Sequence, residues 1–222
     1  MTVSPGPLLS VRGEAELEVA PDLASLELAV EAQGKERQGV LRLLAERTAA
    51  VRDTLSSYGS AVERVDTGTL WVSPVRPGTR RGVDKVTGYQ GNAHMHITVV
   101  DFDVLGDLVL ALAGQEGTVL RGPQWELRTG NPGHQQAREE AVAAAVLRAR
   151  QYAAALGSSL TALIELSDQG LGGGSLRRAH VFAAAMAGGP QEQPELDLRP
   201  VPQTVHASVE ARFTITPPDL DS

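Results

Sequence analysis

The sequence of 222 residues predicts an α+β fold, in which a mainly antiparallel sheet carries its helices packed on one face. Several segments alternate apolar and polar residues with a period of two, which indicates strands with one buried face and one face in water. Three other segments carry apolar residues or alanine at helical spacing. In chain order these elements give β-β-α-β-β-α-β-α-β-β.

The first two strands are expected at residues 8–20 and 23–34. Between them, Pro21 presets the backbone and Asp22 favours a turn, so we expect these strands to form a hairpin. A helix follows over residues 36–58, because apolar residues recur there at helical spacing. Its apolar stripe comprises Val40, Leu44, Val51, Leu55 and Tyr58.

The next two strands, residues 62–73 and 86–100, are expected to form a second, longer hairpin. Its tip is rich in proline, glycine and arginine. A short helix over residues 104–113 and a strand over residues 118–128 follow.

The Asn131-Pro132 pair predicts the start of a long helix over residues 133–156, because it combines a capping residue with proline at the first helical position. This helix is built largely on alanine, so we expect it to lie close against a sheet. Strands follow at residues 159–167 and 204–216.

A long insertion, residues 168–203, separates the last two strands and is rich in glycine and proline. Compact domains rarely hold so long a connection without purpose. We expect a flexible insertion that contacts a protein partner, and its apolar run 181–186 could dock on a neighbouring subunit. No linker cleanly separates two halves, and the one weak boundary lies near residues 78–82, so residues 1–222 are predicted to form a single domain. The pattern leaves open whether the strands form one sheet or two.

Composition limits the function. Lysine and arginine total 20 against 27 aspartate and glutamate, and aromatic residues make up 4%, so nucleic-acid binding is not expected. No apolar run is long enough to span a bilayer, and residues 1–10 lack the features of a secretory signal. With no cysteine present, disulfides and thiolate chemistry are excluded. We therefore expect a soluble, cytoplasmic protein.

Three histidines are candidate metal ligands. His94 and His96 stand two apart on a predicted strand and so share a face, and His206 lies on the polar face of the last strand. Three imidazoles converging on one sheet surface could hold zinc or copper. The alternative is that they are ordinary polar residues in water.

Other motifs have both a functional and a structural interpretation. Asp101 and Asp103 could bind magnesium, although helix capping explains the same residues. The loop 170–175 is rich in glycine but lacks the Lys-Ser/Thr ending of a phosphate-binding loop. The basic tip could bind anions or an acidic partner, or simply be solvated; it comprises Arg76, Arg80, Arg81 and Lys85. Trp71 and Trp125 are expected to pack in a core or an interface.

No nucleophile elbow, metalloprotease helix or cofactor fingerprint is present, and His134 and His180 lie in ordinary settings. The sequence therefore assigns no catalytic, cofactor-binding or metal-binding residues, and no cofactor is expected.

Several short motifs together resemble the SIMPL-domain family, whose members include periplasmic immunogenic and oxidative-stress-defence proteins of bacteria. The motifs are Val11-Arg12-Gly13-Glu14-Ala15, Val19-Ala20-Pro21-Asp22-Leu23-Ala24, Asp66-Thr67-Gly68-Thr69-Leu70, Ser73-Pro74, Gly88-Tyr89, and the alanine- and arginine-rich stretch 145–157. The resemblance implies a mixed sheet and helix fold, a tendency to form homo-oligomers and no established catalytic activity.

We therefore expect a non-enzymatic, self-assembling scaffold or stress-related factor. The alternative hypothesis is a small-molecule or metal-binding module with an unrecognised activity.

Overall fold

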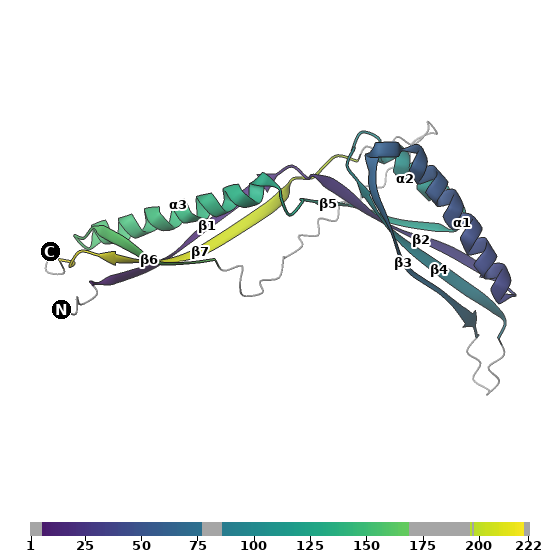
Figure 1. Ribbon diagram of the computed structural model, residues 1–222, viewed down its shortest axis with the longest axis horizontal. Helices are drawn as coiled ribbons and strands as arrows, with labels where there is room; N and C mark the ends of the chain where they lie inside the picture. Colours follow the sequence, from purple (N-terminus) through teal and green to yellow (C-terminus); the bar gives the residue numbers. More distant parts are fainter. Residues whose placement is uncertain (1–5, 77–85, 169–195, 197, 220–222) are drawn as a thin grey trace, which may run out of the picture. The chain divides into compact units, whose positions relative to one another are not determined.

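A computed structural model describes residues 6–76, 86–168, 196 and 198–219 (Figure 1). Its seven strands and three α-helices follow the predicted order, and the α+β class is confirmed. The strands form two antiparallel sheets. Contacts divide the chain into two compact units, where the sequence analysis expected a single one. Of the described residues, the first unit holds 6–19, 129–168 and 203–219, and the second holds 20–76, 86–128, 196 and 198–202.

The first unit is a three-stranded sheet in the order β1-β7-β6, with one helix. Its strands are β1 (Leu8–Val19), β6 (Leu160–Asp168) and β7 (Gln203–Ile215), and its helix is α3 (Pro132–Ala155). The pairing of β1 with β7 is unbroken, from Leu8 opposite Thr214 to Val19 opposite Gln203. The first and last strands of the fold are therefore neighbours.

Helix α3 begins as predicted, because the Asn131 side chain accepts a hydrogen bond of 2.7 Å from the Gly133 backbone N–H. Its buried stripe is almost entirely alanine: Ala137, Ala141, Ala145, Ala149 and Ala153. Small side chains let the helix approach the sheet closely, as the sequence predicts. The approach is close at Gly13 of β1, where an added Cβ would lie 1.9 Å from the Ala141 carbonyl oxygen and 2.6 Å from the Ala145 nitrogen.

The second unit is a four-stranded sheet in the order β3-β4-β2-β5, with two helices. Its strands are β2 (Leu23–Gly34), β3 (Val62–Val75), β4 (Gly88–Val99) and β5 (Thr118–Glu126). Its helices are α1 (Arg37–Ser57) and α2 (Leu105–Ala113), and a short 3₁₀ turn, η1 (Gly59–Ala61), follows α1. Both helices contribute to a core that includes the predicted stripe residues Val40, Leu44, Val51 and Leu55.

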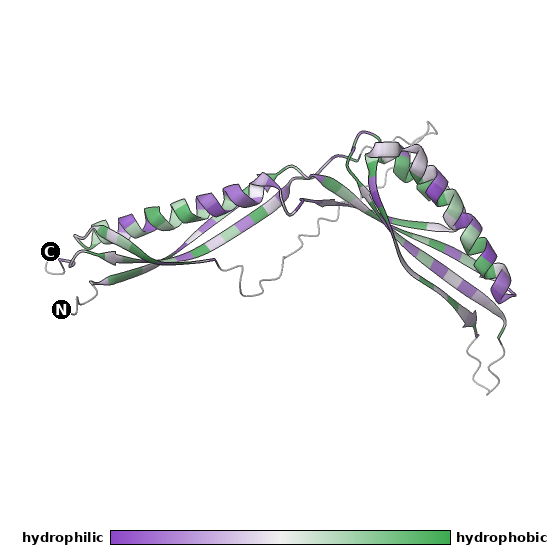
Figure 2. Ribbon diagram, in the orientation of Figure 1, coloured by the Kyte–Doolittle hydropathy of each residue, from purple (hydrophilic) through white to green (hydrophobic). Residues whose placement is uncertain are grey.

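The period-two pattern places one face of the second sheet in this core and the other toward water. Along β4, Met95 and Ile97 are buried while His94 and His96 are exposed. Figure 2 shows the resulting alternation of hydrophobic and hydrophilic bands along the strands. Near the end of the long insertion, Leu198 also packs against this core.

The predicted hairpin between the first two strands is wrong. β1 pairs with β7, whereas β2 pairs with β4 and β5. The Asp22 backbone N–H donates to the Glu126 carbonyl oxygen at 3.0 Å, and the Asp22 carboxylate accepts from the Arg128 backbone N–H at 2.7 Å. Asp22 therefore joins the start of β2 to the end of β5, and the Pro-Asp motif marks where the chain passes from one sheet to the other.

Arg128 also holds β3 in the second unit. Its guanidinium donates two hydrogen bonds to the Glu63 carboxylate, one of them at 3.1 Å between Nη1 and Oε1. This bonding lowers the pKa of the Glu63 carboxyl below its usual value. The hydrogen bond between Asp22 and Arg128 thus joins the beginning and the end of the segment 20–128.

We predict that Gly13→Ala lowers the free energy of unfolding by about 1–3 kcal/mol, because the added methyl meets the helix backbone, which cannot rotate away. Unfolding should be followed by far-UV circular dichroism, because both tryptophans lie in the other unit. Gly39→Ala is the matched control: an added Cβ there meets no atom within 4 Å, and alanine favours the helix. Equal stability of the Gly13→Ala variant and the parent would contradict the close approach.

We predict that Arg128→Gln raises the pKa of the Glu63 carboxyl toward its ordinary value. Because the folded-state pKa is depressed, the pair stabilises the fold at a pH above the pKa of the unfolded carboxyl, and this contribution is lost as the pH falls through the folded-state pKa. Titration of the carboxyl carbon by NMR measures the change. An unchanged Glu63 titration in the variant would show that Arg128 is not its cause.

Candidate functional site

The three candidate histidines do not form one cluster. His94 and His96 are exposed and share the water-facing side of β4, as predicted, with His96 opposite Glu27 and Asp66. His206 belongs to the other unit, where its Nδ1 lies 3.7 Å from a carboxylate oxygen of Glu16. Across the residues that the structure describes, no group of three histidine or carboxylate side chains could hold a metal ion.

The two aspartates before α2 do not cap the helix. The helix begins at Leu105, and its N-cap residue Val104 makes no side-chain cap hydrogen bond. Instead, the Asp101 carboxylate accepts from the Asp103 backbone N–H at 3.1 Å. The capping prediction is therefore wrong: this bond closes a local turn just before the helix.

The tryptophans have different surroundings. Trp125 packs against the core of the second unit, and its ring meets Phe102 edge-on with centroids 4.9 Å apart. Trp71 lies on edge strand β3 opposite Asn92 and is 39% exposed. Of the basic tip, only Arg76 is described, and it is exposed. Arg80, Arg81, Lys85, the loop 170–175, His180 and the run 181–186 lie outside the described residues.

The most distinctive exposed surface of the first unit lies on strand β6, which forms one edge of the sheet. Helix α3 packs on β1 and β7 but makes little contact with β6. Leu163, Ile164 and Leu166 are consequently 54%, 56% and 48% exposed. An uncovered apolar edge strand is a template for pairing with another chain, and natural proteins rarely leave one bare.

Two bulges determine which β6 residues face the helix side. The register with β7 shifts between Leu160 and Ala162 and again between Leu163 and Glu165. Leu160, Leu163 and Leu166 therefore all stand opposite β7 residues on the helix side: Ile215, Phe213 and Ala211. We call these three leucines the β6 leucine row. They lie on one face at a spacing of three, not the two of a regular strand.

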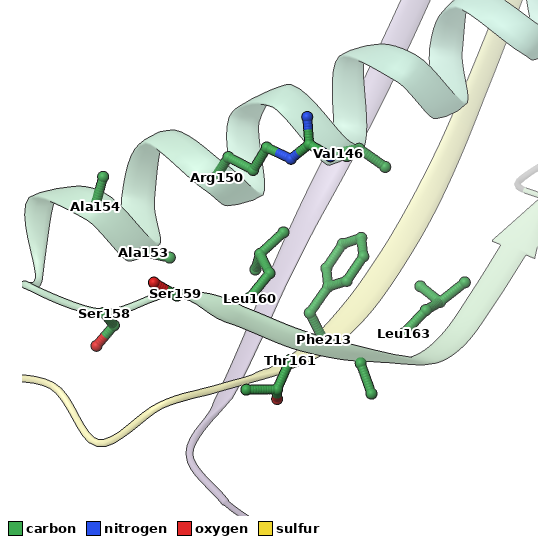
Figure 3. Close-up of a pocket in the computed structure, with 11 residues that line it drawn as sticks. Val146, Arg150, Ala153, Ala154, Ser158, Ser159, Leu160, Thr161, Leu163 and Phe213 are labelled. Atoms are coloured by element: carbon green, nitrogen blue, oxygen red, sulfur yellow. The ribbon is translucent and has the colours of Figure 1, made fainter.

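A groove of about 510 Å³ runs between α3 and β6 (Figure 3). Figure 3 shows Val146 and Arg150 on α3 along one side, Leu160 and Leu163 on β6 along the other, and Phe213 of β7 between them. The groove continues the leucine row toward the helix. The two features together form a surface suited to bind an apolar partner segment.

The opposite face of the same strand is polar. Glu165 stands opposite Arg212 of β7, with 3.0 Å between a carboxylate oxygen and Nη1. The Thr161 and Thr214 hydroxyls are 2.6 Å apart. β6 thus has a hydrogen-bonded polar side and an apolar side that α3 leaves largely uncovered among the residues that the structure describes.

Sequence reasoning located β6 but missed its leucine row. A spacing of three matches neither a regular strand nor a long helix, and bulges carry no clear sequence signal. The one available indication is the density of large apolar residues in a nine-residue strand at the end of the alanine-rich helix segment.

The fold and this surface define an α+β protein with an exposed apolar sheet edge. A model of the SIMPL family, described as a protein of unknown function (DUF541), matches residues 9–213, and the chain belongs to this family. It is similar to the 26 kDa periplasmic immunogenic proteins of Brucella melitensis and Brucella abortus. Each is 27% identical over 177 residues, which cover 76% of this chain and 68% of the relative.

The predicted cytoplasmic location is contradicted by these relatives, both of which are described as periplasmic. The prediction rested on the first ten residues and on composition, and neither cysteine content nor net charge separates the two compartments. None of the helices in the described part of the chain has the length and hydropathy needed to cross a membrane.

Proposed function

We propose that this chain is a non-enzymatic, self-associating protein of the bacterial periplasm that serves as a scaffold or stress-related assembly factor. The observation that carries the proposal is the apolar side of β6, where Leu163 and Leu166 are about half exposed among the described residues and Leu163 lines a groove. Monomeric proteins seldom leave such an edge uncovered, so a protein partner is the simplest explanation.

A second copy accounts for this surface without a further component. The predicted partner contact of the insertion 168–203 belongs to the same proposal, although residues 169–195 and 197 lie outside the described part of the chain. The non-catalytic role rests on the sequence, which carries none of the catalytic or cofactor motifs considered above.

We predict that the parent protein is oligomeric at micromolar concentration and that Leu163→Asp reduces its mass toward that of a monomer. A charge placed on the leucine row would have to be desolvated in an apolar contact. Size-exclusion chromatography with light scattering measures the mass. Leu147→Asp on α3 is the matched control, because Leu147 is 58% exposed and lies outside the row. Deleting residues 177–190 tests the insertion separately, and a monomeric parent protein would overturn the proposal.

We predict that the protein is found in the periplasmic fraction of the bacterium that produces it. Osmotic-shock fractionation with immunodetection, using cytoplasmic and periplasmic marker proteins, measures this location. Recovery with the cytoplasmic marker would refute the proposed compartment without bearing on self-association.

A further inference from the structure

We infer that two copies of this chain join by antiparallel pairing of their β6 strands, with Leu163 on the two-fold axis. This inference rests on the proposed self-association and specifies its contact. It is drawn from the spacing of the leucine row, the charges on the opposite face and the position of β6 at the sheet edge.

The leucine row is symmetric about its centre. Leu160 and Leu166 lie three residues before and after Leu163, and all three face the helix side. Residues that stand directly opposite each other in an antiparallel pair share a face. With Leu163 opposite its own copy, Leu160 falls opposite Leu166 of the second copy, so every leucine of both rows lies on one continuous apolar face.

The other face is compatible with the same register. Glu165 falls opposite Thr161 of the second copy, and both residues lie on the polar side of β6. The two Glu165 carboxylates therefore do not stand opposite each other, and each keeps its own Arg212 partner at 3.0 Å. Like charges directly opposite one another would oppose the pairing, and this register avoids them.

Neighbouring registers match less well. Moving the axis by half a residue, to between residues 163 and 164, places Leu163 opposite Ile164 of the second copy. The same shift places Leu160 opposite Ser167 of the second copy. Ser167 lies on the polar side, because it stands opposite Glu210 within its own sheet. Moving the axis to residue 164 places Leu163 opposite Glu165. Both shifts pair the apolar side with the polar side, so the axis through Leu163 is favoured over them.

This contact is self-limiting. A two-fold pairing uses the same edge on both copies, so it closes once two copies have joined.

Single-cysteine crosslinking tests the register directly, because the chain has no cysteine of its own. Residues opposite each other in antiparallel strands have Cα atoms about 4.5–5.5 Å apart, within the range that a disulfide bridges. Leu163→Cys should form a disulfide-linked dimer in nearly full yield under mild oxidation. Leu160→Cys mixed with Leu166→Cys should give the mixed dimer, and each of these variants alone should give little.

Leu147→Cys serves as the control for random collision, because its side chain is as exposed as that of Leu163. Circular dichroism confirms that each variant is folded. Non-reducing electrophoresis gives the yields, and the expected excess of the Leu163→Cys dimer over the Leu147→Cys dimer is about tenfold or more.

Three results would overturn the inference. An oligomeric protein in which Leu163→Cys does not crosslink shows that another surface joins the copies, and the proposed function would survive. If the Leu163→Cys variant is a monomer and its thiol is protected from maleimide, the chain covers its own β6. If that monomer instead has a reactive thiol, the row is left for a different protein. Either monomeric result would also remove the proposed self-association.

Discussion

The close contact between helix α3 and strand β1 determines the form of the first unit. Gly13 leaves no side chain between the strand and the helix backbone, and the alanine stripe keeps the helix side of the contact equally thin. A helix this close to the sheet packs on β1 and β7 and makes little contact with β6. The small residues that bring α3 close to β1 therefore also explain why α3 leaves the apolar side of β6 largely exposed.

The sequence predicted where the strands and helices lie along the chain, but it did not predict which strands pair with each other. Alternation and helical spacing located all seven strands and three helices, because side-chain direction repeats locally. The hairpin at Pro21-Asp22 was mispredicted because pairing is not local: β1 pairs with a strand almost two hundred residues away. Turn-forming residues signal a change of direction, but they do not specify which strand lies next to which.

Non-local pairing also limited what the sequence could predict about the candidate site. His94 and His96 share a face, as a period of two requires, yet the sequence could not show that His206 belongs to a different sheet. The leucine row was missed because bulges are set by the register between strands, which exists only in the folded chain. The cytoplasmic location was argued from the first ten residues and from composition, and the comparison with relatives described as periplasmic contradicts it.

The pairing of β1 with β7 has a consequence for the order of folding. Most of the second unit is one continuous stretch of chain, residues 20–128, so its strands find their partners within about a hundred residues. The first unit instead needs the two ends of the chain, because β1 pairs with β7, which ends at Ile215. The first unit is therefore the high-contact-order part of the molecule, and contacts so distant along the chain are expected to form more slowly than those of the second unit.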